Sequence, residues 1–197
     1  MKKLMMIVAL VAATVSANAQ NINREVGAFT LQPKVGLALG SFSGDYIKPV
    51  GSDAKPKTRV GFIAGIEGEY YIADWFGAAL GLNYAQQGWK FEDTKTKLDY
   101  LNVPIVANFY VARGLALKTG AQFGFLLNSK VDGVDRKDDC KKMNFSIPIG
   151  ISYEISNIVL DIRYNIALTK VNKYDGPNNE KSRSDMVQFT LGYKFEL

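Results

Sequence analysis

The residues of this chain that could do chemistry are charged side chains at the polar positions of strand-like segments. In segment 158–170, polar residues alternate with large apolar ones, and Asp161 and Arg163 occupy polar positions. Charges on one face of a closed sheet meet in its interior, where an unpaired charge is strongly destabilising. We therefore predict a lumen charge network made of Lys34, Glu67, Glu69, Lys118, Asp161, Arg163 and Lys194.

This network is compatible with more than one role. If the network is a structural plug, its cations neutralise its acids and its side chains fill the interior. If it is a functional site, it forms a polar conduit or binds a ligand. Glu67 and Glu69 lie on one face and each needs a cation, which Lys34 on the preceding segment is placed to supply. The same two carboxylates suggest an acid–base pair as a third role. The mixture of signs favours the plug.

The chain contains no histidine, which excludes Ser-His-Asp and Cys-His catalysis and histidine-ligated zinc. It also lacks the G-x-S-x-G, P-loop and dinucleotide-binding motifs. The charged loop 132–142 does not have the ligand spacing of a calcium-binding EF-hand. We therefore expect a non-catalytic protein with no catalytic residues, no metal site and no cofactor.

Eight strand-like segments must position the charges, and they cover residues 30–42, 59–72, 76–91, 97–111, 115–128, 142–155, 158–170 and 186–197. Their connections alternate in length. The short ones are 73–75, 112–114 and 156–157, and the long polar ones are 43–58, 129–141 and 171–185. This asymmetry is typical of outer-membrane barrels. It predicts an all-β fold, an eight-stranded antiparallel up-and-down transmembrane β-barrel.

Glycines on the polar face indicate which face of these strands points inward. Gly36 and Gly40 occupy polar positions of the first strand, and Gly120 and Gly124 those of the fifth. Glycine weakens a strand exposed to water but suits a crowded interior. We therefore predict that the polar face lines the lumen and the apolar face meets lipid. The alternative is the opposite orientation, a soluble lipocalin-like barrel that binds an apolar ligand.

Two prolines fall inside predicted strands. Pro104 and Pro148 have no backbone N–H to donate to the ladder. We predict a bulge or a missing ladder bond at each of them.

The first residues indicate a secretory signal peptide. Lys2 and Lys3 precede a short apolar run, and Ala17-Asn18-Ala19 fits a cleavage site. We expect a signal peptide at 1–19 and a barrel domain at 20–197. The net charge of +5 is too small to predict binding to nucleic acid. The lone cysteine, Cys140, cannot form an internal disulfide and is interpreted as a loop thiol.

Three motifs carry a resemblance to a known family. Tyr100-Leu101-Asn102-Val103-Pro104-Ile105, Phe145-Ser146-Ile147-Pro148-Ile149-Gly150 and Gly192-Tyr193-Lys194-Phe195 resemble the outer-membrane β-barrel domain family, often labelled "porin family protein". The resemblance implies a small eight-stranded barrel in the outer membrane, and it supplies no functional residues. An aqueous channel, as in porins, belongs to barrels of about 16–18 strands, whereas side chains can fill a barrel of eight.

We therefore expect a monomeric outer-membrane protein with a structural, surface-interaction or adhesion-type role. A narrow channel for small solutes or ions is the alternative. Outer-membrane lipid is the expected partner. Lipopolysaccharide is a further candidate, because basic residues are expected at the external end, namely Lys130, Arg136, Lys137, Lys181 and Arg183. The sequence does not identify a protein partner.

Overall fold

The computed structural model describes residues 25–43, 57–91, 94–131, 134–135, 141–169 and 183–197. The predicted signal peptide and Cys140 lie outside these residues. Within them, no helix has the length and apolar character needed to cross a membrane.

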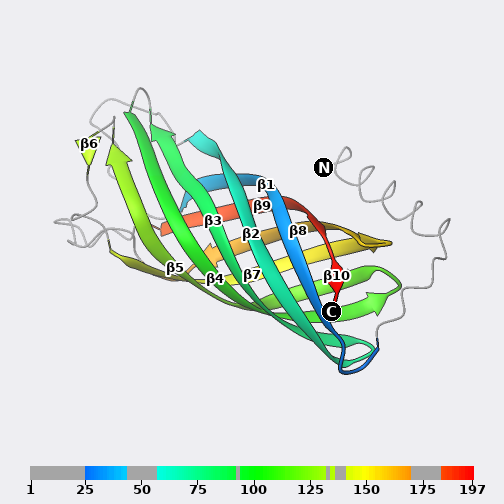
Figure 1. The fold of residues 1–197 in the computed structure, drawn as a ribbon. Helices are drawn as coiled ribbons and strands as arrows, with labels where there is room; N and C mark the ends of the chain where they lie inside the picture. Colours follow the sequence, from blue (N-terminus) through cyan, green and yellow to red (C-terminus); the bar gives the residue numbers. More distant parts are fainter. Residues whose placement is uncertain (1–24, 44–56, 92–93, 132–133, 136–140, 170–182) are drawn as a thin grey trace.

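The described residues form one antiparallel sheet that closes on itself (Figure 1). Its strands are β1 (Phe29–Ser43), β2 (Lys57–Ala73), β3 (Phe76–Phe91), β4 (Thr94–Ala112), β5 (Leu115–Val131), β6 (Val134–Asp135), β7 (Met143–Ile155), β8 (Ile158–Ala167), β9 (Arg183–Tyr193) and β10 (Phe195–Glu196). The two-residue β6 pairs with β5 alone. Both β9 and β10 pair with β1, so together they form the last barrel strand. The predicted eight-stranded barrel is confirmed.

The strands are strongly tilted. One circuit of paired residues starts at Phe29 and returns to the same strand at Leu39; it passes through Tyr70, Ala78, Ala107, Thr119, Ile149, Tyr164 and Val187. A stagger of this kind is required to close a twisted sheet without a free edge. Paired residues on successive strands therefore lie at different heights along the barrel axis, and residues that meet at one height in the lumen are not the ones paired in the sheet.

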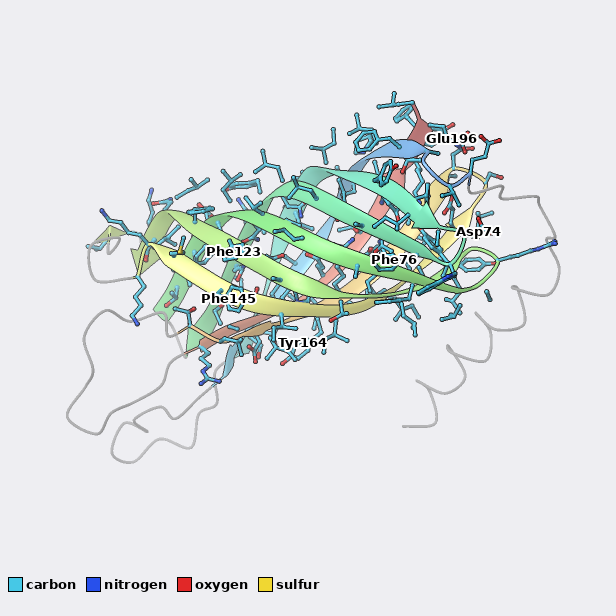
Figure 2. The ribbon with its side chains drawn as sticks, turned by 90° about the horizontal axis from the view of Figure 1, so that it is seen from below. Asp74, Phe76, Phe123, Phe145, Tyr164 and Glu196 are labelled. Atoms are coloured by element: carbon cyan, nitrogen blue, oxygen red, sulfur yellow. The ribbon has the colours of Figure 1, made fainter. Side chains whose placement is uncertain are left out.

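The predicted orientation of the two faces is also observed. On β8, Leu160 is 50% exposed whereas Arg163 is 1% exposed. On β9, Phe189 and Leu191 point outward in the same way. Phe123 and Phe145 lie on neighbouring strands towards the loop end, with ring centroids 5.2 Å apart, and Phe76 lies towards the end with the tight turns (Figure 2). The apolar side chains thus face the surroundings, so the lipocalin-like alternative is wrong.

The in-strand prolines interrupt the ladder without shifting its register. Pro104 pairs with β5, but pairing of β4 with β3 stops at Ile105 and resumes at Asn102. Pro148 pairs with β8, but the pairing of β7 with β5 has the same kind of gap. The predicted missing ladder contacts are confirmed. Pro33, which the sequence analysis overlooked, pairs with β2 and lies in a gap between β1 and the last barrel strand.

Close packing between strands explains the inward glycines. A Cβ atom on Gly36 would collide with the carbonyl oxygen of Phe189, and one on Gly120 with that of Ile105. These positions therefore exclude any side chain, which supports the prediction of a crowded interior.

Apolar side chains also enter the lumen, towards the loop end. Two buried clusters form there, one made of Ala38, Ile63, Ala85 and Met186 and the other of Leu98, Tyr100 and Leu126. The prediction of a lumen filled by polar and charged side chains is therefore incomplete.

Candidate functional site

Five charged residues from β1, β2, β5 and β8 meet in the lumen and form the central cluster: Lys34, Glu67, Lys118, Asp161 and Arg163. Alternation along each strand turns all five inward, and all are at least 95% buried. Their strands come from both halves of the chain, so the cluster ties the barrel wall together across its interior.

Glu67 and Arg163 are the centre of this cluster. The Arg163 guanidinium donates to both carboxylate oxygens of Glu67, at 2.9 and 2.7 Å. It also donates to Asp161, its neighbour on the same face of β8, from Nε at 2.9 Å and Nη2 at 2.8 Å. Bidentate pairs of this kind are the strongest ionic hydrogen bonds in proteins.

Two lysines complete the central cluster. Lys34 Nζ donates to Glu67 Oε2 at 2.6 Å, and Lys118 Nζ donates to Asp161 Oδ2 at 2.7 Å. Lys118 Nζ also lies 3.7 Å from Glu67 Oε1. The cation that Glu67 needs is therefore supplied by Lys34, from the preceding strand, and by Arg163.

A second group of side chains, the turn-end cluster, lies nearer the tight turns: Glu69, Tyr71, Asn108, Tyr110, Glu154 and Lys194. Lys194 Nζ donates to one carboxylate oxygen of Glu69 and one of Glu154, at 3.1 Å each. The other Glu69 oxygen accepts from Tyr110 Oη at 2.6 Å and from Asn108 Nδ2 at 2.7 Å.

The seven residues of the predicted network thus occupy two clusters. Glu67 and Glu69 belong to different clusters, and Glu67 is bound by Lys34 and Arg163 whereas Glu69 is bound by Lys194. They do not face each other as an acid–base pair would. Across the two clusters the cations Lys34, Lys118, Arg163 and Lys194 are matched by Glu67, Glu69, Asp161 and Glu154.

The sequence analysis missed Glu154 as a member of the network, although its inward position on its strand was recognisable. Alternation along residues 186–197 would also place Glu196 on the lumen face, and this placement is wrong. The last barrel strand is interrupted at Lys194, and beyond this break both Phe195 and Glu196 are exposed.

Between the central cluster and the apolar clusters lies a level of neutral amides. Along β8 the inward residues run Arg163, Asn165 and Ala167, from charged through amide to apolar. Asn83 on β3 and Gln188 on β9 are likewise followed, towards the loop end, by the apolar residues Ala85 and Met186. In the described part of the chain the lumen is therefore layered, with ionic groups near the turns and the apolar clusters near the loops, where buried polar residues such as Gln87 and Ser184 accompany them.

A comparison with protein-family models decides the family. The model described as outer membrane protein beta-barrel domain matches residues 18–173. This chain belongs to that family. The protein is therefore an outer-membrane protein of the Gram-negative envelope, as its membrane-facing surface indicates.

Solved structures of small outer-membrane barrels share the fold. Neisserial surface protein A is 22% identical, with a TM-score of 0.54 over 86% of this chain and 99% of that one. The attachment invasion locus protein Ail of Yersinia pestis is 16% identical, with a TM-score of 0.51 over 87% of this chain and 100% of that one. A search of curated proteins finds no match.

Proposed function

We propose that this protein is a non-conducting, non-catalytic barrel that supports surface interactions of the outer membrane. The observation that carries the proposal is the layered lumen. Among the described residues, paired charges at two levels and apolar clusters beyond them fill the lumen, which supports a plug and not a path for ions. In this role the charge network is structural.

One observation favours a second candidate, a narrow passage for water or small solutes. Side-chain atoms of Asn83, Asn165 and Gln188 are buried and have no hydrogen-bond partner among the described residues. Buried amides usually have partners, so water at this level would satisfy them. The apolar clusters at the loop end argue against a passage that continues to the outside.

Planar-bilayer recording separates the two candidates. Insertion is verified first, by the difference in gel migration between heated and unheated samples. We expect no discrete conductance steps for the inserted wild-type barrel. The matched variant Lys118→Ala/Asp161→Ala removes one ion pair without changing the net charge of the lumen, and we expect it to leak more than the wild type. Steady conductance of the wild-type barrel would refute the plug and support the passage.

The surface interaction that we propose involves anionic sugars or lipid head groups. Ail has also been solved in complex with the heparin analogue sucrose octasulfate, a polyanion. In the present chain Lys130 is exposed near the loop end and Arg183 is half-buried there, whereas the other three predicted basic residues lie outside the described residues. Charge reversal at Lys130 and Arg183 should lower the amount of lipopolysaccharide that copurifies with the monomeric barrel.

A further inference from the structure

The turn-end cluster surrounds a single ammonium group. Lys194 Nζ lies 2.9 Å from Tyr71 Oη and 3.3 Å from Tyr110 Oη, in addition to its contacts with the carboxylates of Glu69 and Glu154. It also lies 5.5 and 5.7 Å from the centroids of the two tyrosine rings, which is within cation–π range. Aromatic rings together with carboxylates are a typical enclosure for an ammonium ligand.

The enclosure is held together by contacts that do not involve Lys194. Tyr110 Oη donates to Glu69, and Asn108 donates to the same carboxylate oxygen. The rings of Tyr71 and Tyr110 contact each other, with centroids 5.8 Å apart. These residues come from β2 and β4, which are fixed by pairing with β3 between them. Glu69, Tyr71 and Tyr110 are thus held in place by contacts other than those with Lys194.

Lys194 enters this enclosure from the break in the last barrel strand. Its backbone N–H donates to the carbonyl oxygen of Asn157 at 2.7 Å, and its own carbonyl accepts from Asn157 Nδ2 at 2.9 Å. Its backbone is therefore bound to the turn between β7 and β8, not to β1. Alternation along the last barrel strand turns its side chain into the lumen, as it does for Gln188 and Thr190.

We infer that Glu69, Glu154, Tyr71 and Tyr110 form a binding site for a primary ammonium group, which Lys194 occupies as a tethered ligand. The tether fastens the C-terminal end of the chain. β10 joins β1 through Thr30↔Glu196 and Leu31↔Phe195. Lys194 adds bonds from the same segment to β2, β4 and β7 across the lumen.

Chemical rescue tests this assignment. Lys194→Ala removes the side chain beyond Cβ, and n-propylammonium supplies the same atoms. The measurement is the urea midpoint of the barrel refolded into lipid vesicles, with increasing amine or with NaCl at equal ionic strength. We expect the substitution to lower the midpoint and n-propylammonium to restore it in a saturable manner. Methylammonium should restore it less, and tetramethylammonium, which has no N–H donor, should act like NaCl.

Lys118→Ala is the matched control, because it removes the same atoms from the central cluster. Its midpoint should also fall, but it should respond to n-propylammonium as it does to NaCl. If Lys194→Ala does not fold without amine, the folded fraction on an unheated gel replaces the midpoint and should rise with n-propylammonium. The assignment is overturned if Lys194→Ala shows no saturable rescue by either measurement, or if both variants are rescued equally.

Discussion

Replacing Glu67 with glutamine tests whether the central cluster stabilises the barrel. Glu67 accepts three charge-assisted hydrogen bonds, one from Lys34 and two from Arg163. Each hydrogen bond to a charged group contributes about 1.5–3 kcal/mol to stability. The sum over the three bonds is therefore an upper limit for the stability lost in Glu67→Gln. A glutamine oxygen still accepts part of them, but Lys34, Arg163 and Lys118 then face the single carboxylate of Asp161. Breaking a buried ion pair typically costs about 3–5 kcal/mol, and we expect a loss of that size.

The assay is equilibrium urea unfolding in lipid vesicles, read by the fraction that migrates as folded on an unheated gel. Glu67→Gln is compared with Lys34→Met and with the double variant. Because Lys34 Nζ lies 2.6 Å from Glu67 Oε2, the losses should not be additive. The double variant removes one cation and one carboxylate, so the central cluster keeps the net charge that it has in the wild type, and the double loss should be smaller than the sum of the single losses.

A loss below about 1 kcal/mol for Glu67→Gln, which is the range of exposed pairs, would refute the reasoning. Additive losses would refute it as well, since they would mean that Lys34 and Glu67 act independently. Either result would imply that lumen water screens these charges.

The remaining predictions concern the barrel wall. Leu160→Arg places a charge on the lipid face and should destabilise the barrel by about 2–4 kcal/mol near the midplane, whereas Thr190→Ala in the lumen should cost less in the same urea titration. Equal tolerance of both substitutions would contradict the assigned orientation. Gly36→Ala should destabilise by about 1–3 kcal/mol, because its Cβ would collide with the backbone of β9. The control Gly68→Ala meets only the Phe29 ring, which can move, so it should be tolerated better.

Alternation along the chain was sufficient to predict the barrel and the inward direction of the seven residues of the network. Inward direction is a local property, since successive side chains of a strand point to opposite faces. Gly36 and Gly120 indicated which face of the strands lines the lumen and which face meets lipid. Pro33 escaped notice, although the reason that made Pro104 and Pro148 informative applied to it equally.

The contacts between the charges were less accessible to sequence reasoning. Which inward residues meet depends on their height along the barrel axis, and that height depends on the stagger from Phe29 to Leu39. Glu67 and Lys34 lie on neighbouring strands, so this pair was predictable. Its pairing with Arg163 joins strands that are not adjacent in the sheet, as does the pairing of Glu154 with Lys194.

The division of the lumen into layers has a consequence for where function resides. Charges that are matched within the barrel, with their carboxylates already bound, offer little to a ligand that would have to displace them. The apolar clusters add a second barrier on the loop side. A barrel filled in this way gives its loops a rigid base, since paired charges join strands that are not neighbours in the sheet. In the function that we propose, binding to outside partners is then a property of the loop end, where side chains can vary without disturbing the lumen.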